Sequence, residues 1–331
     1  MSQSSQNPGS TTPAVEVEVD PDEIDSTYGD EVSSASTSIR SSMVRYEWKH
    51  GRRYHSYQAG AYNFPNDDRE QERLDMVHHI YYRLLEDRLF LAPIKPNGLK
   101  ILDIGTGTGI WPIHLGDIYP GASIVGNDLS PIQPSWVPPN VRFILDDVEL
   151  DWTEPEKYDY IHCRYMAGSI KDWPRLVRQI YDNLRPGGWV EFQESANTIY
   201  SEDDSLKPDN ALVQLMKGLM QACDQIGRTM DPAPSFKTWA EEASFNRVTE
   251  QRFRLPVGSW PKDPRLQEVG AFSSVNFFEG VEAFTAVPFR DILGRPREEV
   301  EILNSRVRVA SRCKDIHAMF DFVVVTGQKP E

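Results

Sequence analysis

Short apolar runs alternate with amphipathic stretches through the middle of the chain. Short runs bounded by turn residues are typical of buried strands, and longer stretches with apolar side chains at helical spacing are typical of helices. The predicted strands cover residues 99–104, 123–127, 141–145, 158–163 and 189–193, and a helix is predicted over 173–184. This alternation predicts a parallel sheet with helices on both faces.

A longer amphipathic stretch precedes the first of these strands. Apolar side chains recur at helical spacing over residues 70–91, which predicts a helix there. Residues 66–68, Asn-Asp-Asp, supply side chains that can cap its first turn, and Pro93 and Pro96 end it. The chain therefore enters the sheet from a helix that has an apolar face to bury.

The C-terminal third mixes the two patterns. Helices are predicted over 210–226, 266–291 and 297–312, and strands over 245–256 and 320–326. We therefore expect helical insertions and a closing pair of strands.

Residues 1–42 show neither pattern. They are rich in Ser and Thr, carry an acidic patch between residues 16 and 31, and hold almost no aromatic side chains. Such a segment cannot bury enough apolar surface to offset the entropy of ordering, which predicts a disordered tail. Order is expected from about residue 43, where aromatic residues follow in quick succession.

Composition and charge exclude several classes of function. The net charge of −15 argues against a direct DNA or RNA partner, because nucleic acids are bound by clustered Lys and Arg. The three cysteines, Cys163, Cys223 and Cys313, lie far apart in the sequence, which fits a reducing compartment and provides no metal cage. There is no apolar run of membrane-spanning length and no signal peptide, so we expect an intracellular protein, in the cytoplasm or the nucleus.

A glycine-rich turn follows the first predicted strand of the sheet. Gly105, Gly107 and Gly109 are two residues apart, and Asp103 precedes them. Glycines let the backbone take positive φ and approach a ligand closely, and the helix that begins near Ile110 points free N–H groups at that ligand. The spacing is G-x-G-x-G, which differs from the G-x-G-x-x-G of dinucleotide-binding turns.

Asp103 followed by this G-x-G-x-G spacing resembles motif I of class I S-adenosylmethionine-dependent methyltransferases. Longer blocks narrow the resemblance to the fungal LaeA-like methyltransferases. These blocks are residues 102–111, 126–134 (Gly-Asn-Asp-Leu-Ser-Pro-Ile-Gln-Pro), 136–152, 158–164, 51–55 and 64–75. The resemblance is close over residues 46–194. It implies an α/β fold, with a Rossmann-like, seven-stranded sheet whose last strand runs antiparallel.

The resemblance and the residue pattern together imply four segments. These are a disordered Ser-rich and acidic tail (1–42), an N-terminal helical lid segment (43–98), a core that binds S-adenosylmethionine (99–195), and insertions that cap the substrate together with the closing strands (196–331).

The family implies S-adenosylmethionine as cofactor and a link to fungal secondary metabolism. One interpretation is an enzyme that methylates an oxygen or nitrogen of a small molecule. The other is a regulator of secondary-metabolite gene expression that acts through velvet-type protein partners. The short tail and the lack of a basic run resembling a nuclear import signal weaken the second interpretation.

The matching motifs also imply which residues contact the cofactor. Asp103, Gly105, Gly107 and Gly109 would line the methionine part, Asp128 would accept the ribose hydroxyls, Leu129, Gln133, Asp147 and Val148 would flank the adenine, and Tyr54 with Arg53 would form a lid. Two assignments have structural alternatives. Asp147 is also a typical turn residue, and the lid residues could simply pack the N-terminal helix on the sheet.

Methyl transfer to a hydroxyl needs a base. His162, at the end of the fourth strand, is the first candidate because a neutral imidazole can take a proton near pH 7, and Glu194 is the second. A histidine in a strand is more often held by structural hydrogen bonds, so this alternative stays open. Arg164 could steer an anionic substrate or form a salt bridge. Because the carboxyl ends of parallel strands share one rim, we expect Asp103, Asp128, Asp146, His162 and Glu194 along it.

Overall fold

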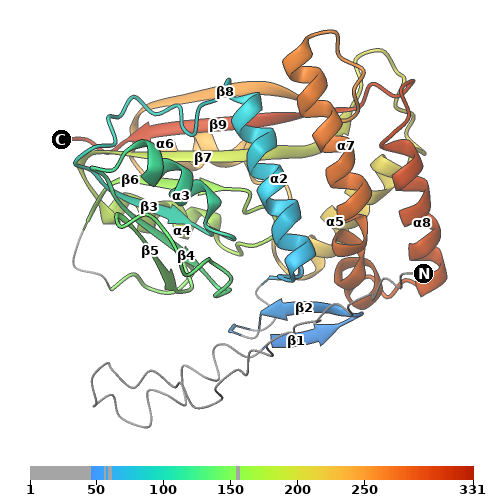
Figure 1. Ribbon diagram of the computed structural model, residues 1–331, viewed down its shortest axis with the longest axis horizontal. Coiled ribbons are helices and arrows are strands. Elements are labelled where there is room, and N and C mark those ends of the chain that lie inside the picture. Colours follow the sequence, from blue (N-terminus) through green and yellow to red (C-terminus); the bar gives the residue numbers. More distant parts are fainter. Residues whose placement is uncertain (1–45, 56, 59–61, 154–156) are drawn as a thin grey trace, which may run out of the picture. The chain divides into compact units, whose positions relative to one another are not determined.

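The computed structural model describes residues 46–55, 57–58, 62–153 and 157–331. A seven-stranded sheet has the strand order β5-β4-β3-β6-β7-β9-β8 (Figure 1). The strands are β3 (Lys100–Ile104), β4 (Ser123–Asp128), β5 (Val141–Leu145), β6 (Tyr158–Arg164), β7 (Leu184–Tyr200), β8 (Asn246–Pro256) and β9 (Met319–Gln328). Strands β5, β4, β3, β6 and β7 pair in parallel, whereas β9 runs antiparallel to both β7 and β8. The predicted seven-stranded α/β sheet with an antiparallel last strand is confirmed.

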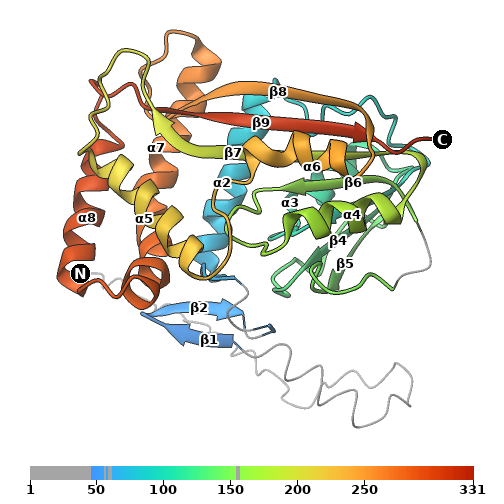
Figure 2. The same ribbon diagram turned by 180° about the vertical axis from the view of Figure 1, so that it is seen from behind.

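Helices cover both faces of the sheet, which is why its central strands are continuous apolar runs. The helices are α2 (Asp68–Leu84), α3 (Ile110–Ile118), α4 (Trp173–Asn183), α5 (Ala211–Gln225), α6 (Phe236–Glu242), α7 (Pro264–Thr285) and α8 (Arg297–Ala310), with a 3₁₀ turn at Ala233–Ser235 and a π-helical turn at Ala286–Ile292. Helices α2 and α3 lie on one face, and α4 and α6 on the other (Figures 1 and 2).

Three hydrophobic clusters hold these layers together. Trp111 and Leu115 of α3 pack on the inner strands, and Trp173 and Leu176 of α4 pack on the opposite face. The third cluster joins α2, α5, α7 and α8, and includes Phe289. In the described part of the chain, no helix has the length and apolar character needed to cross a bilayer.

Most predicted helices and strands are present with small shifts in their ends, and the structure differs from the prediction in three respects. The side chain of Asp67 caps α2 by accepting the N–H of Glu70 (3.1 Å), within the predicted cap at 66–68. The helix predicted over 70–91 ends earlier, because Glu86 and Asp87 both adopt a positive φ of 59°. Strand β7 continues to Tyr200, well beyond the predicted end at residue 193.

The third difference is that the sequence pattern missed two short elements. These are α6 and a hairpin of β1 (Tyr46–Lys49) and β2 (Arg52–His55), which lies within the segment predicted as helical. Each is too short for its periodicity to stand out. The predicted disordered tail, residues 1–42, lies outside the described residues.

A buried carboxylate ties the segment after α2 to the middle of the sheet. Glu191 of β7 is fully buried and accepts the backbone N–H groups of Leu91 (2.9 and 3.0 Å) and Ala92 (2.7 Å). It also accepts hydrogen bonds from Gln193 (2.7 Å) and from the hydroxyl of Tyr160 (3.3 Å). One side chain therefore satisfies two buried backbone donors that have no other partner in the sheet.

Glu191→Ala should lower the free energy of unfolding by about 2–5 kcal/mol, because it leaves two buried N–H groups unpaired. Urea unfolding of the purified protein measures this. Glu301→Ala is the matched control, since its exposed pair with Arg297 on α8 should contribute under about 1 kcal/mol. Equal stability of the two variants would contradict the anchoring role.

Candidate active site

The glycine turn between β3 and α3 forms a cradle. Gly105, Gly107 and Gly109 all take positive φ, of 64°, 58° and 81°. A Cβ added to Gly107 would meet only Leu74, at 3.7 Å, so the backbone of Gly107 faces open space. A Cβ on Gly109 would lie 2.4 Å from Phe143, so this glycine is needed for close packing of helix and strand.

Asp128, at the end of β4, holds this turn in place. One carboxylate oxygen accepts the N–H of Gly107 and the other accepts the N–H of Ser130, both at 2.8 Å. Burial raises the pKa of the Asp128 carboxyl, although these two N–H groups act to lower it. Each carboxylate oxygen has a second lone pair, so Asp128 can still accept hydrogen bonds from the hydroxyls of a ligand.

A cavity that is partly open to solvent lies over the glycine turn. Of the residues predicted to contact the cofactor, those that line it are Asp103, Gly105, Gly107, Asp128, Leu129, Asp147 and Val148. Asp146 lines it too. The carboxyl-end rim of the sheet therefore brings these groups together as expected from the strand order.

Three predicted cofactor residues do not line this cavity. Gly109 packs against Phe143, as described above. Gln133 lies behind the turn, where its amide donates to the carbonyl oxygens of Gly107 (2.6 Å) and Ser130 (2.9 Å). Tyr54 is buried in β2, and burial raises its pKa to about 12. Its neighbour Arg53 donates to the carbonyl oxygen of Asn66 (2.7 Å), which fits the packing alternative.

His162 is enclosed in the core beneath the glycine turn. Its side chain has no exposed surface, its Nδ1 lies 2.7 Å from Asp103, and its ring stacks on Trp111 at 3.9 Å between centroids. The second oxygen of Asp103 accepts the hydroxyl of Thr106 (2.6 Å). His162 lines neither of the two cavities described here, so the geometry favours the structural alternative for this residue.

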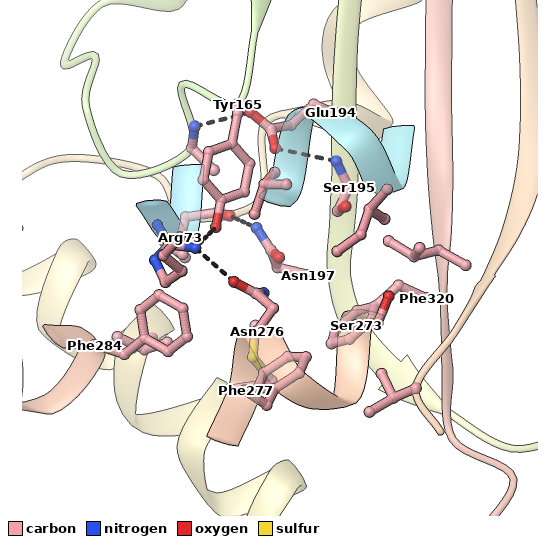
Figure 3. A pocket seen from close by; sticks show the side chains of 18 of the residues that line it. Arg73, Tyr165, Glu194, Ser195, Asn197, Ser273, Asn276, Phe277, Phe284 and Phe320 are labelled. Carbon is pink, nitrogen blue, oxygen red and sulfur yellow. Dashed lines mark hydrogen bonds between the residues drawn. The ribbon is translucent and has the colours of Figure 1, made fainter. Parts of the chain in front are cut away.

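A second cavity, shown in Figure 3, shares part of its lining with the first. Most of its wall is apolar or aromatic and comes from α2, α5, α7, β8, β9 and two loop residues: Val77, Ile80, Tyr81, Met216, Leu219, Phe277, Phe284, Leu255, Phe320, Phe64 and Val257. Its polar groups are few: Arg73, Glu194, Ser195, Asn197, Ser273 and Asn276. Small-molecule sites are typically apolar with a few placed polar groups.

Glu194 is the acidic group of this second cavity. It lies on β7, is 2% exposed, and accepts the N–H groups of Ala167 (2.9 Å) and Ser195 (3.0 Å). Burial raises the pKa of Glu194 to about 7, even though these hydrogen bonds lower it. A carboxyl group with this pKa can take up and release a proton near neutral pH.

Arg73 brings no net charge to the same wall. Glu70 binds its guanidinium through both oxygens (3.0 and 2.6 Å), and this pair is almost fully buried. Two further hydrogen bonds run from Arg73 to the hydroxyl of Tyr165 (3.2 Å) and to the side-chain oxygen of Asn276 (2.7 Å), as Figure 3 shows. These bonds fix two polar groups that face the cavity.

The two cavities meet at a shared boundary. Tyr62, Val77 and Tyr165 line both of them. Tyr165 follows β6 directly and has a positive φ of 59°, which is rare for an aromatic residue and tends to occur at functional sites. The two cavities are therefore adjacent, and these three side chains form the boundary between them.

Sequence reasoning missed Arg73, Tyr165 and Asn276. The family blocks include Arg73, but its position on the apolar side of a helix gave no sign that it faces a cavity. The positive φ of a tyrosine has no signature in the sequence. Within the described residues, no group of three or more His, Cys, Asp or Glu side chains is placed to hold a metal ion.

Comparisons with known proteins agree with the motifs. A family model described as "Methyltransferase domain" matches residues 76–250. "Methyltransferase pytC" of Aspergillus terreus is 62% identical over 317 residues, which is 96% of each chain. "Secondary metabolism regulator LAE1" of Cochliobolus heterostrophus is 33% identical over 86% of this chain and 94% of its own length. "Secondary metabolism regulator laeA" of Aspergillus fumisynnematus is 35% identical over 85% of this chain and 76% of its own.

The raised pKa of Glu194 should make stability depend on pH. The ordinary pKa of a glutamate, 4.5, rises to about 7 in the folded protein, so between these values the folded state holds a proton that the unfolded state has lost. This contribution to the unfolding free energy is present at low pH and is lost as the pH rises toward 7. Glu194→Gln cannot titrate, so its stability relative to the unaltered protein should rise by about 2–3 kcal/mol from pH 5 to pH 8.

Urea unfolding at the two pH values measures this difference. Glu298→Gln, on the exposed side of α8, is the control and should follow the unaltered protein at both. A stability difference for Glu194→Gln that does not change with pH would contradict the raised pKa.

Proposed function

The chain belongs to the fungal LaeA-like family of methyltransferases, and on that basis we propose that it methylates an oxygen or nitrogen of a small, largely apolar molecule. Its cofactor is S-adenosylmethionine, which supplies a methyl group already activated by a sulfonium. The observation that carries the proposal is the shared boundary of the two cavities at Tyr62, Val77 and Tyr165.

The residues of the first cavity fit this cofactor. The backbone at Gly107 leaves room that a side chain would fill, and Asp128 has free lone pairs for the two ribose hydroxyls. Leu129 and Val148 offer apolar edges to the adenine, and Asp147 offers an acceptor for its amino group. These roles are part of the proposal.

The second cavity supports an apolar acceptor. Its aromatic wall favours a molecule with rings or an aliphatic chain, because burying such a surface is favourable and makes few demands on hydrogen bonding. The walls also exclude water from the reacting atoms, which methyl transfer requires. The chain's own task is then to align the acceptor and to remove a proton from it.

We assign the proton transfer to Glu194. It is buried in the acceptor cavity, and its pKa of about 7 leaves a large ionised fraction at neutral pH. The ionised carboxylate can accept the proton of an acceptor hydroxyl as the new bond forms, or take the proton of an ammonium first, so that the neutral amine then attacks the methyl group. His162, the first candidate in the sequence, is enclosed in the core and hydrogen-bonded to Asp103, which supports a structural role instead.

The regulator interpretation is a second candidate. The relatives named as regulators of secondary metabolism are 33–35% identical, against 62% for the relative named as a methyltransferase. Binding of a velvet-type partner and residence in the nucleus belong to this candidate, whereas residence in the cytoplasm fits the enzyme. A pull-down against velvet-domain proteins separates the two. So does a search for a methylated metabolite that disappears when the gene is deleted.

The purified protein should bind S-adenosylmethionine and S-adenosylhomocysteine. Asp128→Ala should weaken binding by about 1.5–3 kcal/mol, through loss of a charged acceptor. Gly107→Val should abolish binding, because its side chain fills the cradle and its φ of 58° strains any residue but glycine. Titration calorimetry measures both, with Glu298→Ala as the control. Unchanged affinity in both variants would contradict the cofactor site.

Glu194→Gln should lower kcat by about 10²-fold or more while cofactor affinity stays the same, because general-base catalysis contributes this much. The rate of the unaltered enzyme should rise with pH up to about 7, as the carboxyl ionises. His162→Asn should change kcat by less than about tenfold, since alignment is retained. The acceptor for this assay comes from comparing metabolites with and without the gene. A large loss in His162→Asn with little loss in Glu194→Gln would reverse the assignment.

A further inference from the structure

Arg164 is a cation of the cofactor cavity that no carboxylate of the described residues contacts directly, although Asp103 lies near enough to favour its charged form. It is the last residue of β6 and, among the described residues that line this cavity, the one Lys or Arg. It forms no salt bridge within the described part of the chain. Its contacts are a hydrogen bond from Nη2 to Nδ1 of His78 (2.9 Å) and the face of the Tyr81 ring (5.7 Å). Burial lowers the pKa of its guanidinium.

Two histidines hold Arg164 in this position. A guanidinium can only donate, so Nδ1 of His78 must be the acceptor and carries no proton. The proton of neutral His78 is then on Nε2, which donates to Nδ1 of His114 (3.1 Å). Burial and the nearby Arg164 lower the pKa of His78 to about 2, so it stays neutral and keeps this direction of bonding. The chain of donors runs from Arg164 through His78 to His114.

The strand register places Arg164 opposite Asp128 across the glycine turn. Ile104 pairs with Asn127 on one side and with Cys163 on the other. One residue further along these strands come Asp128 on β4, Gly105 on β3 and Arg164 on β6. The carboxylate of Asp128 and the guanidinium of Arg164 therefore flank the turn from strands that are two strand spacings, about 10 Å, apart. A ligand lying along the glycine turn therefore meets a hydrogen-bond acceptor at one end and a guanidinium at the other.

The charges of the cavity match those of the cofactor. Apart from Arg164, its ionised lining groups are carboxylates: Asp103, Asp128, Asp146, Asp147 and Glu149. S-adenosylmethionine carries two positive charges, on the sulfonium and the ammonium, and one negative charge, on the carboxylate. With the ribose hydroxyls at Asp128, the amino-acid end would extend along the turn toward Arg164.

We propose that Arg164 binds the carboxylate of the methionine part of S-adenosylmethionine, and that His78 is the positioning residue that aims the guanidinium. The assignment rests on the proposed function, because it concerns the same cofactor. It makes the amino-acid end a determinant of affinity, in addition to the adenosine contacts at Asp128 and the glycine turn. It also gives a role to a half-buried cation that the methyl-transfer step itself does not use.

Calorimetry with two ligands tests this without an acceptor. The probes are S-adenosylmethionine and its decarboxylated analogue, which keeps the sulfonium and the amine. The unaltered protein should bind the analogue about 10- to 100-fold more weakly, the range for a lost charged hydrogen bond. Arg164→Gln should weaken the binding of S-adenosylmethionine by the same factor and change the affinity for the analogue by less than about threefold. The variant should then bind the two ligands about equally. Equal binding of the two probes by the unaltered protein would overturn the proposal without any variant.

His78 has its own matched pair of variants. His78→Leu removes the acceptor for Arg164 and should reduce the preference for the carboxylate ligand, while His78→Asn keeps an acceptor oxygen and should restore part of it. If these residues have a purely structural role, the His78 variants and Arg164→Gln should bind both probes more weakly by the same factor. That result would overturn the proposal. Failure of the unaltered protein to bind either probe would overturn the proposed function itself. The two failures are therefore distinguishable.

Discussion

Helix α2 gives one wall to each cavity, and its burial is the constraint on which the site depends. Leu74, Val77 and His78 line the cofactor cavity, whereas Arg73, Val77 and Tyr81 line the acceptor cavity. Positions three and four apart share a helix face, so these are two adjacent faces that meet at Val77. Burying such a helix places the guanidinium of Arg73 in the interior. This costs desolvation free energy that is offset only because Glu70 and two neutral acceptors surround the charge.

The second constraint is the unequal length of the strands. Strands β3, β4 and β6 end at a common rim, where the glycine turn, Asp128 and Arg164 meet the cofactor cavity. Strand β7 runs past this rim to Tyr200, paired with β9. Its extension carries Glu194 into the acceptor cavity, away from the other acidic groups. One sheet therefore builds two sites of different character, one acidic and one largely apolar.

Much of this could be predicted from the sequence, because apolar runs define the strands and parallel strands share a carboxyl edge. That logic located Asp103, Asp128 and Glu194 on the rim and identified the glycine turn. It could not divide the rim between two cavities, because residues 194–198, Glu-Ser-Ala-Asn-Thr, lack the apolar pattern that would predict that β7 continues past residue 193. Nor could it find the buried pair of Arg73 and Glu70. The buried face of a helix is inferred from its apolar side chains, so two charged residues there are expected to be exposed. Tertiary packing decided both.

The central claim is that the methyl group of the cofactor faces the acceptor cavity across the boundary formed by Tyr62, Val77 and Tyr165. A crystal structure of the protein with S-adenosylhomocysteine tests it most directly. The account predicts that the sulfur lies at this boundary, with the ribose over Asp128 and the cavity of Glu194 open on its far side. A ligand whose sulfur points away from that boundary, or one bound in the aromatic cavity instead, would contradict it.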